Sequence, residues 1–302
     1  MRRFIFIAGL LVLLVAPVSI ARAETAWVSV VDFGSTPFAQ QTAEKLRERL
    51  RTADELKIAD ADLTRSAAKG IGYAGSLNLS VSEARDLGAA LSTEFYVLGD
   101  TQTLRRSSFK RPVYYESYCS LFVVSSRTGR LITWERPSVE SNHATEAETR
   151  LLENFSSTDT LHRIIISIRR AREDEQALRT LVATKSEPLI EEAPEDDKAA
   201  EVQGIRLPRP YRRLRPEYPE SAARAEAEGT VDVLVDVGAD GEVGDVRVAR
   251  WAGFGLDESA IQAARQIKFR PAHLDGQPVA ARALVQYKFS LKSQAASPAT
   301  CK

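Results

Sequence analysis

The stretch "EGTVDVLVDVGADGEVGDVRV", residues 228–248, decides the fold expected for the C-terminal part of the chain. Valine recurs at every second position from Val231 to Val237, and most positions between are polar, so the pattern predicts a strand with one buried face. The turn sequence "GADGE" then reverses the chain, and residues 243–250 are predicted to return as its hairpin partner. A small antiparallel sheet is therefore expected here.

Helices and one more strand extend this hairpin in both directions. Residues 220–228 are rich in alanine and glutamate and predict a short helix that Gly229 ends. Asp257 is predicted to cap a second helix, and residues 279–291 alternate as a long last strand. The order helix, strand, strand, helix, strand predicts a small α+β domain over residues 205–292.

The preceding part, residues 24–182, is predicted to form a separate α/β domain. An apolar strand over 25–35 precedes a helix that starts at Pro37, and a second strand is plausible near residue 57. Ser80 and Glu83 have the spacing of a capping box before another helix. Strand-like runs then cover 94–104, 113–125 and 130–135, and a long helix ends the domain; its predicted buried stripe is Leu161, Ile164, Ile165, Ile168 and Ala171.

The segment between the two domains differs from both in composition. Residues 183–204 are acidic and lack aromatic side chains, so a disordered, flexible linker is predicted, and residues 293–302 are predicted to be a disordered tail. Five arginines then lie among prolines at positions 206–215. A patch for anionic lipid or nucleic acid is one interpretation. The favoured interpretation is that they offset the acidic linker, and no nucleic-acid partner is expected.

The first 23 residues have the composition of a secretory signal. Arg2 and Arg3 precede an apolar run over residues 4–20, and Ala21-Arg22-Ala23 supplies a small-x-small cleavage site. The prediction is cleavage after Ala23 and a periplasmic location. The alternative is that residues 4–20 remain as an inner-membrane anchor, although Pro17 interrupts this run, which is at the lower limit for spanning a bilayer.

The sequence gives no sign of catalysis, a metal site or a cofactor. Lysine plus arginine equals aspartate plus glutamate at 41 each, so no net charge points to a polyanion. "GIGYAG", residues 70–75, lacks the preceding strand and following helix of a dinucleotide site, so a loop is favoured. The three histidines, 143, 162 and 273, show no ligand spacing, and Cys119 is expected to be a core residue, while Cys301 lies near the C-terminus. An enzyme is therefore not expected.

The C-terminal domain resembles the TonB C-terminal domain over residues 205–292. The similarity is carried by Tyr218-Pro219-Glu220, the opening stretch, "LDESAIQAARQIKFRPA" at 256–272, "DGQPV" at 275–279 and "ALVQYKFSL" at 283–291. It implies a small sheet whose last strand offers an edge to a short extended segment, the TonB box of an outer-membrane transporter. Pairing with an edge strand satisfies its open hydrogen-bonding groups. The residues expected to bind this partner are Arg213, Arg215, Pro216, Tyr218, Arg282, Leu284, Gln286 and Lys288.

The N-terminal domain is similar in pattern to TolB N-terminal and CsgG-like periplasmic domains. The similarity rests on "VSVVDFG", "EARDLGAALSTEFYVLGD" and "SSRTGRLITWE", and it implies an assembly or interaction module.

Two functions are therefore expected from the resemblance. The first is a cell-envelope protein that binds TonB-dependent transporters by strand addition and supports energised transport, with an ExbB–ExbD-like motor as a further partner if residues 4–20 are retained. The second is a periplasmic scaffold that is uncoupled from a motor. Better-known TonB sequences carry a histidine in the membrane segment and a glutamine where Arg215 stands here. Homodimerisation through the last strand is the competing use of its edge.

Overall fold

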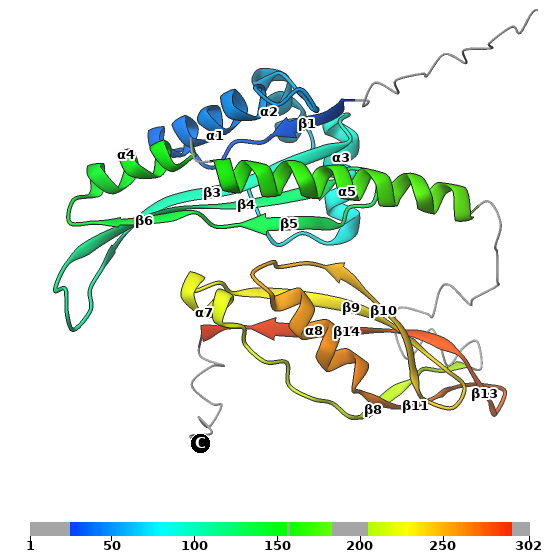
Figure 1. Ribbon diagram of the computed structural model, residues 1–302. Coiled ribbons are helices and arrows are strands. Elements are labelled where there is room, and N and C mark those ends of the chain that lie inside the picture. Colours follow the sequence, from blue (N-terminus) through cyan, green and yellow to red (C-terminus); the bar gives the residue numbers. More distant parts are fainter. Residues whose placement is uncertain (1–24, 156–157, 183–204, 292–302) are drawn as a thin grey trace, which may run out of the picture.

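The computed structural model describes residues 25–155, 158–182 and 205–291, which form an N-terminal and a C-terminal unit (Figure 1). The predicted signal peptide, linker and tail lie outside these residues. Helices and strands contribute to both units, as expected for an α+β chain with two domains. Within the described ranges no helix has the length and hydrophobicity needed to cross a membrane.

The N-terminal unit is built on one mixed sheet with the strand order β2-β1-β3-β4-β5. Strand β1, which lies between β2 and β3, is parallel to both neighbours, whereas the long strands β3 and β4 form an antiparallel hairpin. The strands are β1 (Ala26–Val30), β2 (Leu56–Ile58), β3 (Phe95–Arg106), β4 (Tyr114–Ser125), β5 (Leu131–Glu135) and β6 (Ser138–Ser141), the last pairing with the start of β4.

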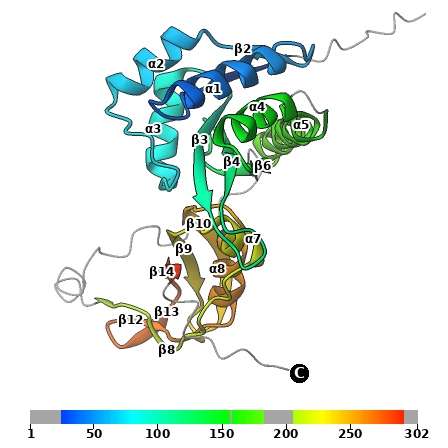
Figure 2. The same ribbon diagram turned by 90° about the vertical axis from the view of Figure 1, so that its left-hand side faces the viewer.

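Helices cover both faces of this sheet, and Figure 2 shows β3 and β4 between α3 on one side and α4 and α5 on the other. The helices are α1 (Pro37–Leu50), α2 (Ala61–Gly70), α3 (Val81–Leu91), α4 (Ala144–Asn154) and α5 (Thr158–Val182). Helix α1 shares the core of α4 and α5, while α2 and α3 belong to the core on the opposite face. The expected capping box is present, with the Ser80 hydroxyl accepting from the N–H of Glu83 and the Glu83 carboxylate accepting from the N–H of Ser80.

Three elements of this unit were not predicted from the sequence. Helix α2 buries only Thr64 and Ala68, and α4 buries only Ala147 and Leu151, so neither shows an apolar stripe. Strand β6 is short and half-exposed. Elements that bury so little leave almost no periodic signal.

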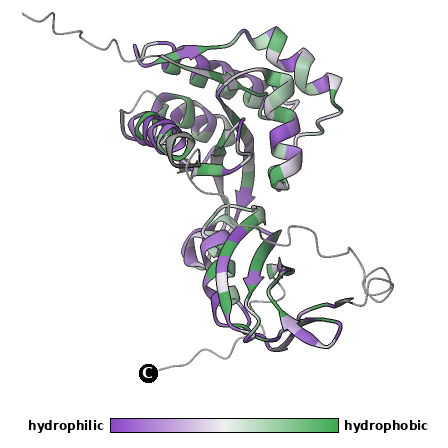
Figure 3. Cartoon of the chain, turned by 90° about the vertical axis from the view of Figure 1, so that its right-hand side faces the viewer, coloured by the Kyte–Doolittle hydropathy of each residue, from purple (hydrophilic) through white to green (hydrophobic). Residues whose placement is uncertain are grey.

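The C-terminal unit contains a three-stranded antiparallel sheet with the order β10-β9-β14. Its main elements follow the expected order: α7 (Glu220–Ala225), β9 (Gly229–Val237), β10 (Val243–Arg250), α8 (Leu256–Arg265) and β14 (Ala281–Phe289). The valines at 231, 233, 235 and 237 are all buried, and the colours along the strands in Figure 3 alternate accordingly. Helix α8 packs on this buried face against β9 and β10.

The expected last strand over 279–291 is found as β14, except that its first residue, Val279, ends the separate strand β13. Five short strands form two further small sheets: β7 (Ile205–Arg206), β8 (Arg209–Arg212), β11 (Lys268–Arg270), β12 (Ala272–Leu274) and β13 (Gln277–Val279). Strand β13 pairs with β12, whereas β14 pairs with β9, so the change of sheet falls between Val279 and Ala281. Alternation alone does not show where a strand changes partner.

The two units meet at residues 251–254, a segment we call the docking loop. The Trp251 side chain is almost fully buried and stacks on Phe122 of β4, with ring centroids 5.8 Å apart. Phe254 contacts both Phe122 and Trp134, at centroid distances of 5.4 and 5.2 Å. The indole N–H of Trp251 donates to the carbonyl of Gly129 over 3.0 Å. A single hydrophobic core therefore joins the sheet face of the N-terminal unit to the interior of the C-terminal unit.

Asn78 fastens the same junction by hydrogen bonds. Its side-chain amide donates to the carbonyls of Thr230 and Trp251, over 2.9 and 2.7 Å, and its Oδ1 accepts from the N–H of Thr230 over 3.1 Å. The backbone N–H of Trp251 donates to the carbonyl of Leu79 over 3.1 Å. Asn78 therefore uses both ends of its side chain to satisfy backbone groups where β9 begins and β10 ends.

Asp257 supports the docking loop from the first turn of α8, so the prediction that it caps this helix is wrong. The N-cap position is Gly255, and the Asp257 carboxylate accepts instead from the N–H groups of Ala252 and Gly253, over 2.8 and 2.9 Å. Burial raises the pKa of Asp257 to about 6, outweighing these two hydrogen bonds. The Asp257 carboxylate binds the docking loop and does not cap the helix, because two N–H groups of this loop point toward it.

Substitution of Gly253 tests how tightly the docking loop is packed. Its φ of +73° favours glycine, and an added Cβ would lie 2.3 Å from Cε1 of Phe122. We expect G253A to lower the free energy of unfolding by about 2–4 kcal/mol, from backbone strain and overpacking together. G276A is the matched control, because Gly276 has a φ of +83° but no atom near the added Cβ. Urea unfolding of both variants measures the difference, and equal losses would contradict tight packing at Phe122.

Titration of Asp257 makes the stability of the fold depend on pH, and the sign of this dependence follows from its pKa. Since folding raises its pKa from 3.8 to about 6, the native state holds this proton more tightly than the unfolded chain. Its contribution to stability is complete below the unfolded pKa and is lost as the pH rises through 6, by about 3 kcal/mol at most. Compared with D257N, which does not titrate, the native protein should therefore lose stability across this window. A relative gain with rising pH, measured by urea unfolding, would contradict the assignment.

Candidate functional site

Strand β14 forms one edge of the C-terminal sheet. It pairs with β9 in continuous register, from Ala281 opposite Val237 to Phe289 opposite Gly229. On its other side no strand is paired with it in the part of the chain that the structure describes. Such an edge has open N–H and C=O groups that an extended chain can satisfy.

At every second residue of β14, the backbone N–H and C=O groups point away from β9. The guanidinium of Arg213 donates to the carbonyl of Gln286 over 3.3 Å, so this carbonyl points to the outer side. In an antiparallel strand the N–H and C=O of one residue share a side, and the side changes with each residue. Leu284, Gln286 and Lys288 therefore all present their backbone groups outward, and their side chains are exposed.

A proline- and arginine-rich segment, residues 206–218, flanks this outer side, and we call it the arm. In Figure 1 it follows β14 from β8 to α7. Two adjoining grooves separate the arm from the strand, one of about 400 Å³ beside residues 283–286 and one of about 660 Å³ beside residues 286–289. The edge is therefore partly guarded, because the arm stands beside it without forming a strand ladder.

Most of the predicted partner-binding residues surround these grooves. The larger groove is lined by Arg213, Arg215, Pro216, Tyr218, Gln286 and Lys288. Leu284, which is 63% exposed, lines the smaller groove together with Arg213. The structure thus brings these seven residues to one edge, where all of them border the outer side of β14 or belong to the arm.

Arg282 lies outside both grooves and has a visible structural role. Its guanidinium forms an ion pair with Asp236 of β9, with Nε and Oδ1 2.6 Å apart. Burial opposes ionisation of Asp236, but Arg282 and Arg247 outweigh it and lower the pKa of this carboxyl. The pair fastens β14 to β9.

Tyr218 likewise contributes to the frame of the site. Its hydroxyl donates to the carbonyl of Ala227, and its ring packs edge-on against Phe289 with centroids 6.1 Å apart. These contacts hold α7 and the end of the arm against the end of β14. Tyr218 therefore positions the larger groove as well as lining it.

Tyr287 is a feature that the sequence pattern did not single out. Alternation places it in the core, where it is 6% exposed, yet its hydroxyl has no hydrogen-bond partner among the described residues. The guanidinium of Arg213 lies 5.9 Å from the centre of its ring. Burial raises the pKa of Tyr287, so its hydroxyl remains a neutral donor next to the larger groove.

The edge of β14 offers backbone hydrogen bonds and two grooves to a partner. The groups typical of metal binding, phosphate binding or thiol chemistry are not gathered there among the described residues. In the described ranges no three histidine, cysteine or acidic side chains are grouped as metal ligands. Gly70 is the last residue of α2, and Gly72 and Gly75 follow it, so no helix opens on these glycines as a phosphate site requires. Cys119 is fully buried, and burial raises its pKa to about 12.

Comparison with known proteins finds a family that the C-terminal unit is similar to. Residues 215–291 match the family model of the Gram-negative bacterial TonB protein C-terminal domain. Protein TonB of Xanthomonas campestris pv. campestris (strain B100) is 40% identical over 77 residues, which are 25% of this chain and 34% of that protein. Protein TonB of Vibrio cholerae serotype O1 is 34% identical over 82 residues, covering 26% and 33%.

A solved structure, the TonB C-terminal domain of Pseudomonas aeruginosa, is also similar to part of this chain. It is 29% identical, covers 28% of this chain and 87% of that chain, and has a TM-score of 0.25. This chain spans about a third of the length of the curated relatives it matches. The similarity of the N-terminal unit to TolB and CsgG-like domains stays a prediction. The similarity to the TonB family therefore covers residues 215–291, which match the C-terminal domain of that family.

Proposed function

We propose that the C-terminal unit binds an extended segment of an outer-membrane TonB-dependent transporter by strand addition to β14. The observation that carries this proposal is the row of outward backbone groups at Leu284, Gln286 and Lys288, within the region that matches the family. An added strand would satisfy these groups, and the exposed side chains beside them would select the sequence of the guest. The protein would thereby support energised transport across the outer membrane.

The arm sets the condition for binding. The carbonyl of Gln286 already accepts a hydrogen bond from Arg213, so a guest that pairs there must displace this side chain. Arg213 would thus compete with the guest for the carbonyl of Gln286. Arg215, Pro216 and Tyr218 would form the outer wall of the same site. The proposed action is binding alone, with no catalytic step.

A scaffold uncoupled from a motor is the second candidate function. It is favoured by the docking loop, which fastens the C-terminal unit to the N-terminal unit through a shared core. Under the first function, residues 4–20 would remain in the inner membrane and contact an ExbB–ExbD-like motor. Under the second, cleavage after Ala23 would release the chain into the periplasm. The N-terminal mass of the protein from cells separates the two, because only the scaffold begins at Glu24.

Peptides carrying the TonB boxes of transporters from the same organism test the partner directly. We expect them to bind residues 24–302 and to slow amide exchange at residues 284, 286 and 288, as measured by NMR. Homodimerisation through β14 is the competing outcome, and it would show as the same protection without peptide, increasing with protein concentration. Absence of binding by every peptide of the set would refute the proposed partner.

A proline at position 284 separates the backbone of β14 from its side chains. L284P removes one outward N–H without touching the hydrogen bonds to β9, whereas L284A removes only the exposed side chain. We expect L284P to weaken peptide binding at least tenfold, and L284A to weaken it by about threefold or less. Fluorescence anisotropy with a labelled TonB-box peptide measures both. Similar affinities for the two variants would argue against strand addition.

Loss of Arg213 should make the edge easier to occupy. In R213A the carbonyl of Gln286 has no competing donor, so we expect tighter peptide binding by about two- to tenfold, the value of one hydrogen bond. R213K is the control, because it retains the charge but not the planar guanidinium. Weaker binding by R213A would show instead that Arg213 contacts the guest in the bound state.

A further inference from the structure

A third groove lies between the two units, on the side of the C-terminal sheet opposite β14. It has a volume of about 800 Å³, and its walls are residues 130–134 of the β5 region and residues 245–249 of β10. Both walls contribute consecutive residues. One face of a strand would contribute only every second residue, so the groove exposes the edges of both strands.

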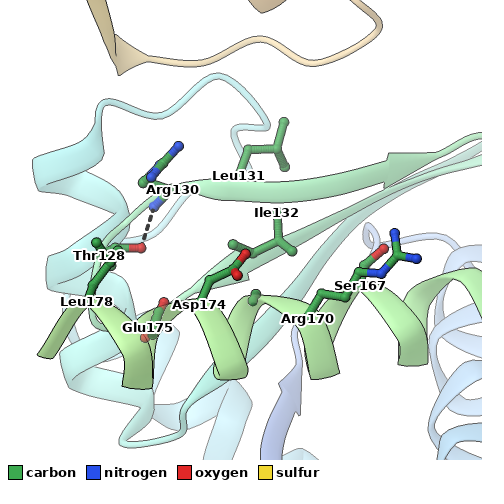
Figure 4. A pocket seen from close by; sticks show the side chains of 10 residues that line it. Thr128, Arg130, Leu131, Ile132, Ser167, Arg170, Asp174, Glu175 and Leu178 are labelled. Atoms are coloured by element: carbon green, nitrogen blue, oxygen red, sulfur yellow. Dashed lines mark hydrogen bonds between the residues drawn. The ribbon is translucent and has the colours of Figure 1, made fainter. Parts of the chain in front are cut away.

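Strand β5 turns backbone groups into this groove at Leu131 and Trp134. The carbonyl of Arg130 accepts from the N–H of Ser125, so residue 130 faces β4, and the next residue, Leu131, faces away from it. Trp134 lies opposite Phe122 of β4, whose own backbone groups face β3, and so it also faces outward. The register shift between Leu131 and Trp134 lets these two residues, three positions apart, both face outward. Figure 4 shows Leu131 and Ile132 on opposite faces of β5, with Ile132 toward α5.

Strand β10 also points backbone N–H and C=O groups into the groove, at Val246 and Val248. Because Gln286 faces away from β9, its pair Asp232 faces β10, and so does Leu234 two residues later. Leu234 is opposite Arg247, so the residues on either side of Arg247 turn outward. No hydrogen bond to the outward groups of these two valines, or of Leu131 and Trp134, is seen within the described residues.

The charges at the groove are of both signs and are partly unpaired. Arg247 is paired with Asp236 and Asp245, but Arg130 and Glu258 are exposed and form no ion pair within the described ranges. A guest with one acidic and one basic end would complement them. The acidic residues 187–201 of this chain would instead meet Asp245 and Glu258 unfavourably.

We propose that this groove binds a second extended segment, from a partner protein, with alternating apolar residues and with opposite charges at its ends. The segment would pair with the outward groups of Leu131, Trp134, Val246 and Val248, and its apolar side chains would cover Ile261 and the half-buried Trp134. It would contact both units at once. This site does not involve β14, so an experiment can refute one of the two proposed binding sites without refuting the other.

The test uses residues 24–302 and a fluorescein-labelled peptide, acetyl-Lys-Val-Thr-Val-Thr-Val-Glu-amide. We expect saturable binding and slower exchange of the amides of the four outward residues, with no change at residues 284, 286 and 288. A peptide of the same composition with its three valines adjacent is the control for pattern. Equal binding of the control peptide, or protection confined to β14, would overturn the proposal.

Charge reversal provides variants that keep the fold, because Arg130 and Glu258 are exposed. We expect R130E to weaken binding of the peptide two- to fivefold, and a peptide with lysine in place of its glutamate to regain that loss in R130E. V248P, compared with V248A, removes one outward N–H and should weaken binding at least tenfold. L284P should leave this binding unchanged. If the four amides are already protected without peptide, another part of this chain or a second copy covers the edges, and the proposal is wrong.

Discussion

The burial of Trp251 against Phe122 is the contact on which the arrangement of the whole chain depends. The sheet of the N-terminal unit has helices α1, α4 and α5 on one face, but α2 and α3 cover only part of the other. The docking loop covers the region around Phe122, and it fits because Gly253 has no side chain there. Each unit thus supplies surface that the other requires, and the C-terminal unit is fixed in orientation through its β9–β10 end.

That orientation decides which strand edges remain open. Asn78 and the Leu79 carbonyl occupy the end of β10 nearest the junction, and the rest of β10 faces the groove shared with β5. Strand β14 lies on the opposite side of β9, where only the arm stands beside it. Open edges promote aggregation unless they are guarded. Here the prolines and arginines of the arm guard the edge of β14, and a specific partner could displace them. Irregular register guards the edge of β10.

The sequence predicted the elements whose burial follows a clear period, and it predicted one side of the candidate site. The valines of β9, the helix at Pro37 and the capping box at Ser80 were all found as expected. The docking loop could not be predicted, because Trp251 is buried by a residue far away in the sequence. The predicted role of Asp257 as a helix cap was wrong for the same reason, because its hydrogen-bond partners belong to that loop. The position of the arm beside β14 also depends on tertiary contacts. Alternation alone predicted which residues of the last strand point outward, and its role as a binding edge was implied by the resemblance.

The unbroken register between β14 and β9 has a mechanical consequence. Force applied along the axis of β14 loads all the hydrogen bonds of that ladder together, in shear, whereas force across it would break them one pair at a time. The ion pair of Arg282 with Asp236 lies at the Ala281 end of the same ladder. Strand β9 continues the load path to Thr230, where Asn78 and the docking loop join the N-terminal unit. A guest strand pulled parallel to β14 would therefore transmit tension through the C-terminal sheet into the N-terminal unit before the sheet itself came apart.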